Sequence, residues 1–258
     1  MMDGRRFDVV LFDLGNTLLY FNGDWTPILL EMDRALLAVL WERRYDLKET
    51  DFIADYSLRW LEYDRRRIAD HSESSAASVL RDSLRQFGYL DPPAEDIRAA
   101  LAASYAVSQA HWFLEADAQL MLEILQKEGY RLGLVSNASD AEDVYTLVDR
   151  SQLTPYFEQI VISAIQGIRK PDPRIFKPVF DHFQVAPDRM AMVGDTLSAD
   201  ILGARNVGIH SIWITRRADR PDNRAVMDTI KPDAMIRTLA ELPALLTQPG
   251  LFPVKQPA

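Results

Sequence analysis

Short apolar runs that alternate with helical patterns are the feature that most restricts the fold of this chain. Six runs have the length and composition of buried strands, and five of them lie after residue 130. They are Phe7 to Phe12, Arg131 to Val135, Gln159 to Ser163, Met190 to Val193, His210 to Ile214 and Ala234 to Ile236. Helical patterns separate the later runs, at Asp140 to Asp149, Pro173 to Phe183 and Ser198 to Asn206. This alternation is typical of right-handed crossovers, so we predict an α/β fold with a doubly wound parallel sheet.

The stretch from Asn22 to Trp112 has a different pattern, with helical periodicity and no convincing strand. Thr26 and Pro27 are expected to begin a first helix, a second follows Thr50, and two more cover Ser72 to Phe87 and Pro92 to His111. A helical module of about ninety residues therefore interrupts the α/β unit after its first strand. We predict an α/β core formed by residues 1–20 and 114–258 and a helical cap formed by residues 21–113.

Composition restricts the possible partners. The chain has 258 residues, a formal net charge of -9 and no cysteine, which excludes thiol nucleophiles and thiolate metal sites. Its acidic field would repel nucleic acid, so we expect a small soluble partner. No uncharged apolar stretch approaches the roughly 20 residues of a membrane helix, and no secretory signal pattern is present. We expect a cytoplasmic protein without a membrane or nucleic-acid partner, and the sequence does not predict its oligomeric state.

Polar residues follow several of the predicted strands where each strand ends. The first strand leads to Asp13, the second to Ser136 and Asn137, and the fourth to Asp195. Lys170 follows the third strand, and Asp200 lies one helical turn beyond Asp195. Ligands of open parallel sheets bind beyond these carboxyl ends. Carboxylates, a hydroxyl and a lysine at one rim indicate a hard cation such as Mg²⁺ beside a bound phosphate.

Four ordered motifs carry a resemblance to a known family. They are LFDLGNTL, RLGLVSN, GIRKPDPRIF and MVGDTLSAD. Together they resemble the haloacid dehalogenase superfamily of hydrolases, and the resemblance spans nearly the whole chain. The helical insert between the first and second motifs resembles the cap of the subclass that carries its cap there. The resemblance implies a Mg²⁺-dependent phosphatase acting on a small phosphorylated metabolite.

The same resemblance implies a role for each motif residue. Asp13 would be the nucleophile that becomes an aspartyl-phosphate, while Ser136 and Lys170 would hold the transferring phosphoryl group. Asp195 would bind Mg²⁺ directly, and Asp200 would support the metal site or fix Lys170. Metal ligands are thus expected among Asp13, Asp195, Asp200 and the main-chain carbonyl of Gly15.

Gly15 departs from the pattern of most phosphatases in this superfamily. The residue two after the nucleophile is usually a second Asp, which protonates the leaving oxygen and later activates water. Loss of general acid–base catalysis typically costs about 10² to 10⁴ in rate. A cap residue, a water polarised by Mg²⁺ or by Thr17, or a substrate with an acidic leaving oxygen could compensate, and we favour the last.

Two further polar residues complete the candidate substrate contacts. Thr17 and Asn137 are expected to face the substrate together with Ser136 and Lys170, although Thr17 also fits a structural hydroxyl of the turn. Asn16 stands where the family usually has glycine, and a left-handed backbone there would suit Asn.

Other activities of the superfamily remain open because Gly15 does not distinguish them. Metal-independent 2-haloacid dehalogenases also lack the second Asp, but they lack paired acids such as Asp195 and Asp200. A phosphonate hydrolase would need a cap lysine, and Lys48 is the only lysine between Asn22 and Trp112. A phosphatase is therefore the first interpretation, a dehalogenase the second, and a non-catalytic binding relative the third.

Overall fold

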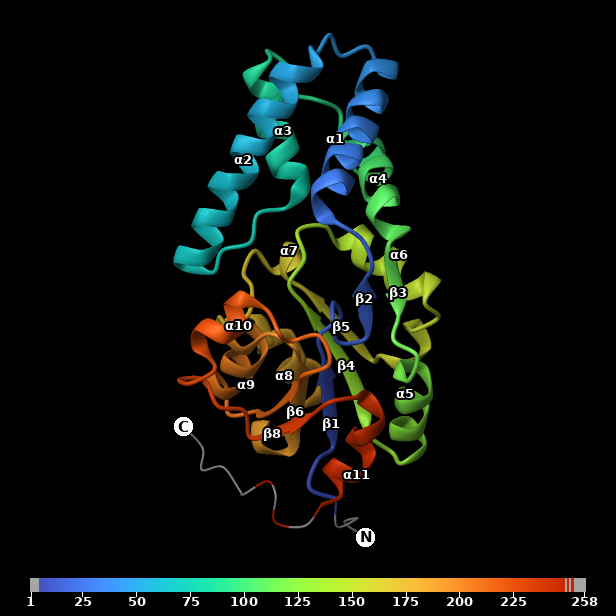
Figure 1. Ribbon diagram of the computed structural model, residues 1–258, viewed down its shortest axis with the longest axis vertical. Coiled ribbons are helices and arrows are strands. Elements are labelled where there is room, and N and C mark those ends of the chain that lie inside the picture. Colours follow the sequence, from blue (N-terminus) through green and yellow to red (C-terminus); the bar gives the residue numbers. More distant parts are fainter. Residues whose placement is uncertain (1–4, 249, 251, 253–258) are drawn as a thin grey trace.

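Six parallel strands form the central sheet of the computed structural model, which describes residues 5–248, 250 and 252. The strands lie in the order β5-β4-β1-β6-β7-β8, as Figure 1 shows. Their bounds are β1 Val9–Phe12, β4 Arg131–Ser136, β5 Gln159–Ile162, β6 Met190–Gly194, β7 His210–Ile214 and β8 Ala234–Ile236. The predicted α/β class and parallel sheet are confirmed, and each predicted strand is found within two residues of its expected ends.

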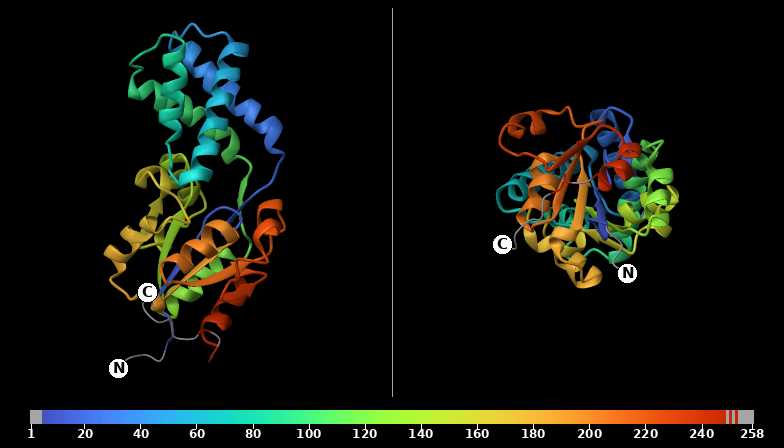
Figure 2. Two further views of the ribbon diagram at one scale, coloured as in Figure 1. Left: turned by 90° about the vertical axis from the view of Figure 1, so that its left-hand side faces the viewer. Right: turned by 90° about the horizontal axis from the view of Figure 1, so that it is seen from below.

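Helices cover both faces of the sheet, which explains why its strands are apolar throughout. Alternate residues of β1 enter two different cores: Val10 and Phe12 contribute to one, and Val9 and Leu11 to the other. The first core includes residues of α5, α6 and α11, and the second includes residues of α8 and α9. These two layers are visible in the view from below in Figure 2. The helices are α5 Ala118–Lys127, α6 Ala141–Arg150, α7 Ser163–Gln166, α8 Lys177–Phe183, α9 Leu202–Asn206, α10 Pro221–Val226 and α11 Leu242–Leu246.

Four longer helices form a separate layer beyond the carboxyl ends of the strands (Figure 1). They are α1 Trp25–Glu42, α2 Glu49–Asp70, α3 Ala76–Gln86 and α4 Ala94–Gln109, and we call them the helical cap. The cap has a hydrophobic core of its own, which includes Leu36, Phe52, Leu80 and Leu101. Among the described residues, no helix combines the length and apolar character that a membrane crossing requires.

The starts of all four cap helices differ from the sequence prediction. The second, α2, begins at Glu49, before the expected Thr50. Asp24, not Thr26, caps α1, because its side chain accepts a hydrogen bond from the Thr26 N–H. Ser75 caps α3, three residues after the expected start at Ser72, by accepting from the Ser78 N–H. The fourth helix begins after Pro93. Asp24 and Ser75 are favoured N-cap residues that fix the first turn of their helices, whereas Pro93 makes no side-chain cap hydrogen bond.

A two-stranded antiparallel ribbon connects the cap to the core, and the sequence analysis missed it. Leu19–Phe21 (β2) pairs with Trp112–Leu114 (β3), and Leu19 lies opposite Leu114. Strands of three residues are too short to produce a recognisable periodicity. The division between core and cap at residues 20/21 and 113/114 stays a prediction, and this ribbon lies at both of its junctions.

Candidate active site

The carboxyl ends of the three central strands bring the predicted site residues together. Asp13 follows β1, Ser136 ends β4 and Asp195 follows β6, and β1 lies between the other two strands. All three line a cavity of about 360 Å³ together with Gly15, Asn137, Lys170 and Asp200. Chain segments far apart in the sequence therefore share one pocket, as expected at a switch point of a doubly wound sheet.

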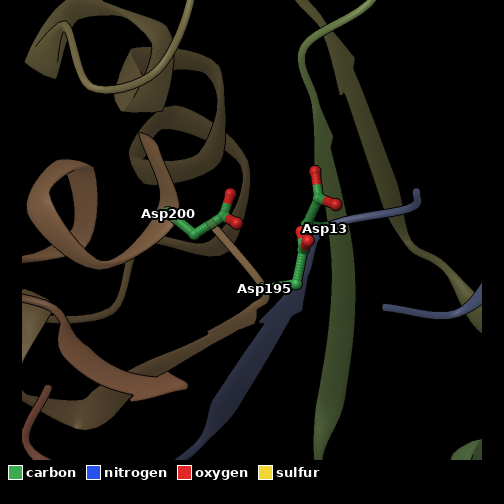
Figure 3. A group of neighbouring side chains, drawn as sticks. All are labelled: Asp13, Asp195 and Asp200. Atoms are coloured by element: carbon green, nitrogen blue, oxygen red, sulfur yellow. The ribbon is translucent and has the colours of Figure 1, made fainter. Parts of the chain in front are cut away.

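Three buried carboxylates face one another in this pocket. Asp13, Asp195 and Asp200 each offer an oxygen, and these oxygens lie within 4.8 Å of one another. Figure 3 shows Asp200 directed from its turn toward the ends of β1 and β6. A set of hard oxygen donors at this spacing fits a divalent cation such as Mg²⁺.

Burial makes the charged forms of Asp13 and Asp195 costly. Desolvation raises the pKa of Asp13 to about 6, with a further rise from Asp200 that Lys170 opposes. Desolvation, followed by the charges of Asp200 and Asp13, raises the pKa of Asp195 to about 8. A bound cation would stabilise the ionised forms, so the pocket is electrostatically suited to hold one.

Lys170 is the buried cation of the pocket. Its Nζ lies 2.7 Å from Asp13 Oδ1 and 2.8 Å from Asp200 Oδ1, and it donates to the main-chain carbonyl of Val135. Burial alone would lower the pKa of Lys170, but the two carboxylates outweigh it and the pKa is raised. Lys170 is therefore held as an ammonium beside the carboxylate of Asp13.

Asn137 fixes the main chain of Lys170 at both polar groups. Its Nδ2 donates to the Lys170 carbonyl at 3.0 Å, and its Oδ1 accepts from the Lys170 N–H at 2.8 Å. Asn137 lines the pocket, where the sequence predicted a substrate contact. The sequence did not indicate that Asn137 also positions Lys170.

Asp200 reaches the pocket because Gly194 has no side chain. A β-carbon on Gly194 would lie 2.3 Å from the Asp200 Cγ, which is closer than real atoms approach. The Asp200 carboxylate also accepts the Thr196 N–H at 2.9 Å. Asp200 is buried within the site and is not exposed on a helix surface.

Gly15 faces an aromatic ring where a longer side chain would stand. A β-carbon on Gly15 would lie 3.3 Å from Cη2 of Trp112, which also lines the pocket. Asn16 has φ 56°, so the expected left-handed backbone is confirmed. Thr17, in contrast, is fully buried and does not line the pocket, and its hydroxyl has no hydrogen-bond partner among the residues that the structure describes.

Arg220 is a pocket residue that the sequence analysis missed. Its Nη1 lies 2.9 Å from Asp195 Oδ2, and its Nη2 donates to the Thr196 hydroxyl at 2.7 Å. Arg220 lies in the loop after β7, so inspection of the residues beyond the fifth predicted strand would have found it.

A second cavity, of about 760 Å³, lies between the cap and the core. Its lining includes the aromatic residues Trp25, Tyr56, Trp60, Tyr105 and Trp112 and the acids Asp33, Asp64, Glu73, Asp140 and Asp143. Five residues line both cavities, namely Trp112, Asn137, Ala138, Asp143 and Arg169. The second cavity therefore adjoins the first and provides room for a larger group than a phosphate.

Polar contacts hold the cap over the core at this junction. Arg98 on α4 pairs with Asp140 at 3.1 Å, and Gln109 on α4 donates to Asp143 Oδ1 at 2.9 Å. Glu73, between α2 and α3, also contacts the core, because it accepts a hydrogen bond from the Ser163 hydroxyl at 2.7 Å.

Comparisons with known proteins agree with this arrangement. A family model described as haloacid dehalogenase-like hydrolase matches residues 7–208. The chain is 30% identical to N-acylneuraminate-9-phosphatase of Rattus norvegicus over 248 residues, covering 93% of this chain and 94% of that enzyme. It is 34% identical to glyceraldehyde 3-phosphate phosphatase of Pyrococcus furiosus over 122 residues, covering 47% of this chain and 48% of that enzyme, so this second match spans about half of the relative's length.

Solved structures show the same fold. A 2-haloacid dehalogenase from Pseudomonas syringae is 26% identical with a TM-score of 0.65, over 93% of this chain and 98% of that one. Named relatives thus include both phosphatases and a dehalogenase.

Proposed function

This chain belongs to the haloacid dehalogenase-like hydrolase family, and we propose that it is a magnesium-dependent phosphatase that hydrolyses a small phosphomonoester through an aspartyl-phosphate on Asp13. The observation that carries the proposal is the convergence of three buried carboxylates and Lys170 at the end of β1. Phosphatases among the similar proteins support the same reaction class.

The pocket residues divide into metal-holding and phosphoryl-holding groups. Asp13, Asp195, Asp200 and the main-chain carbonyl of Gly15 would hold Mg²⁺, which when bound neutralises phosphate charge and favours attack by a carboxylate. Asp13 would use its second carboxylate oxygen as the nucleophile. The phosphoryl oxygens would be stabilised by the hydroxyl of Ser136 and the ammonium of Lys170.

Lys170 would also keep the nucleophile in its reactive form. The carboxylate of Asp13 must be ionised to attack phosphorus, and burial opposes that ionisation. The ammonium at 2.7 Å compensates by stabilising the negative charge. Attack then forms a bond between a carboxylate oxygen of Asp13 and phosphorus while the bond from phosphorus to the ester oxygen breaks and the alcohol leaves. Hydrolysis of this mixed anhydride by water returns the free carboxylate and releases phosphate.

The leaving group would occupy the cavity beneath the cap. This cavity, which we call the cap cavity, adjoins the cavity of about 360 Å³ at the strand ends, which we call the phosphate pocket. The cap cavity offers aromatic faces at Trp25, Tyr56 and Trp60. A substrate whose alcohol portion packs against aromatic rings fits this lining, whereas a leaving group carrying several negative charges would face the acids Asp33, Asp64 and Asp143.

A dehalogenase is the second candidate, favoured by Gly15 and by the 26% identical dehalogenase structure. Against it, a metal-free reaction gives no use for the facing acids Asp195 and Asp200. Release of phosphate from a panel of phosphomonoesters, and of halide from 2-haloacids, should be measured with Mg²⁺ and with a chelator. Mg²⁺-dependent phosphate release that disappears in Asp13→Asn supports the phosphatase, and chelator-insensitive halide release would replace it with the dehalogenase.

A further inference from the structure

The missing acid at Gly15 leaves a chemical requirement that another group must meet. When the phosphorus–oxygen bond of an alkyl ester breaks, the leaving oxygen needs a proton, and the later attacking water must lose one. Carboxylates lining the phosphate pocket are Asp13, Asp143, Asp195, Asp200 and Asp222. Three of these form the facing set that would hold the metal, so two acids remain for proton transfer.

Asp143 and Asp222 differ in their positions. Asp222 is exposed and lies near Arg220, with 3.5 Å between its Oδ1 and the arginine Nε. Asp143 is partly buried and lines both the phosphate pocket and the cap cavity. Among the five residues shared by the two linings, Asp143 is the only carboxylic acid. A phosphomonoester spanning the two cavities would place its bridging oxygen at this junction.

The first turn of α6 holds Asp143 in place. Its main-chain N–H donates to Asp140 Oδ1 at 3.0 Å, and Asp140 caps this helix. Gln109 Nε2 donates to Asp143 Oδ1 at 2.9 Å. No hydrogen bond to Asp143 Oδ2 is found among the described residues. One oxygen is therefore fixed by the cap while the other is available to a ligand.

The surroundings of Asp143 also suit a group that exchanges a proton near neutral pH. The pKa of Asp143 is raised to about 6, mainly by desolvation and also by the charge of Asp140. The Gln109 hydrogen bond and the charge of Arg98 oppose this rise. Tyr105 on α4 also faces this group, and the charges of Asp140 and Asp143 contribute to the raised pKa of its phenol. A general acid works best with a pKa near the working pH.

We propose that Asp143 is the general acid and general base of this enzyme, acting from the core helix α6 in place of the side chain absent at Gly15. This inference rests on the proposed phosphatase function. It also differs from the three compensations considered from the sequence, because the group comes from neither the cap, nor water, nor the substrate.

The proton balance of the two steps is complete. In the first step Asp13 attacks phosphorus, the bond to the leaving oxygen breaks, and protonated Asp143 gives its proton to that oxygen to form the alcohol. In the second step water attacks the phosphorus of the aspartyl-phosphate, Asp143 takes a proton from that water, and the bond to Asp13 breaks. Phosphate leaves, and both aspartates return to their starting forms.

Asp143→Asn separates proton transfer from binding when two leaving groups are compared. With an alkyl phosphate the variant should lose about 10² to 10⁴ in kcat/KM, the range typical of general acid–base catalysis. With p-nitrophenyl phosphate, whose leaving group needs no proton, aspartyl-phosphate formation measured in a single turnover should fall less than tenfold. Across a series of aryl phosphates, the dependence of kcat/KM on leaving-group pKa should become steeper than in the wild type.

Two matched variants test a purely structural role for Asp143. Gln109→Ala removes the cap contact that fixes one oxygen of Asp143 but keeps the carboxyl, so its loss with the alkyl phosphate should be smaller than that of Asp143→Asn. Asp149→Asn removes an exposed acid from the same helix and should change neither substrate. Asp143→Glu retains an acid, so it should recover part of the alkyl phosphatase activity, and it serves as the second test if Asp143→Asn does not fold.

The outcomes distinguish this inference from the function on which it rests. If the wild type releases no phosphate from either ester, the proposed phosphatase and the role of Asp143 both fall. If the wild type is active but Asp143→Asn loses the same factor with both esters, the role of Asp143 falls while the phosphatase stands. A wild-type leaving-group dependence as steep as that of Asp143→Asn would also overturn it, in favour of a substrate with an acidic leaving oxygen.

Discussion

Arg220 forms an ion pair with Asp195 at the rim of the phosphate pocket, with 2.9 Å between Nη1 and Oδ2. Asp195 is one of the three carboxylates that would hold a metal ion. The three acids of this set thus contact two cations, Lys170 and Arg220. Arg220 is only partly buried and belongs to a loop. Of the two cations, it is therefore the one whose positive charge would compete with a bound Mg²⁺ for Asp195.

Arg220→Gln should therefore bind Mg²⁺ more tightly. Removal of the positive charge of a partly exposed arginine is worth about 1 kcal/mol, which corresponds to about a fivefold lower Mg²⁺ concentration at half-maximal activity. Titration of phosphate release against Mg²⁺ measures this midpoint. Arg224→Gln, which removes an exposed arginine paired with Asp219, is the control and should leave the midpoint unchanged. A weaker midpoint in Arg220→Gln would indicate that this arginine supports the metal site.

Mg²⁺ affinity should rise with pH between about 6.5 and 8.5. Burial and the neighbouring charges of Asp200 and Asp13 raise the pKa of Asp195 to about 8, so below that pH a proton occupies the group that the metal needs. Each pH unit below the pKa should weaken binding up to about tenfold. Calorimetric titration in buffers of different ionisation enthalpy measures both the affinity and the protons released. A pH-independent affinity without proton release would contradict the expected protonation of Asp195.

Asp13→Asn should abolish phosphate release without unfolding the protein. The amide cannot act as the nucleophile, but it removes a buried charge whose ionisation is disfavoured, as the raised pKa of Asp13 shows. Lys170 keeps its contact with Asp200 at 2.8 Å, so the buried ammonium retains a partner. Thermal unfolding monitored by circular dichroism should give a midpoint at or above that of the wild type. A large decrease would mean that the ion pair with Lys170 stabilises the fold more than desolvation destabilises it.

The sequence was sufficient for the parts of this site that follow from strand ends. Asp13, Ser136 and Asp195 each terminate an apolar run, and parallel strands bring such positions to one edge. Asn137 was placed in the pocket for the same reason, but its paired hydrogen bonds to Lys170 depend on a loop conformation that periodicity does not encode. The sequence could not predict that Trp112 lies beside Gly15, because their proximity arises from the short pairing of β2 with β3.

Gly15→Asp should be destabilising because of Trp112. The new β-carbon would lie 3.3 Å from the indole ring, closer than most real contacts, and the carboxylate extends beyond it. Overpacking of this kind typically costs about 1 to 3 kcal/mol. Trp112→Ala should remove the clash, so the two substitutions should be non-additive, with Gly15→Asp costing less stability in the Trp112→Ala background. Urea unfolding of the four proteins of this cycle measures the coupling, and additive free energies of unfolding would show that the ring moves aside freely.

Asp33→Asn should stabilise the protein at neutral pH and lose that advantage in acid. Asp33 lies on α1 beside the cap cavity, and burial raises its pKa to about 6 from an ordinary value of 3.8. The folded state therefore binds more protons than the unfolded state between these values, and the stability contributed by Asp33 falls as pH rises through this window. Because the side chain is partly exposed, we expect a cost of about 1 to 2 kcal/mol at pH 7.5.

The asparagine removes that cost at pH 7.5, whereas at pH 4 most of the aspartate is already protonated in the folded state and the two proteins should unfold alike. For a chain of this size the gain corresponds to about 2 to 8 °C in Tm. Thermal unfolding at pH 7.5 and pH 4 measures the difference. Glu31→Gln removes an exposed acid from the same helix and should shift Tm little at either pH. An equal gain for Asp33→Asn at both pH values would show that the burial of its charge is not the cause.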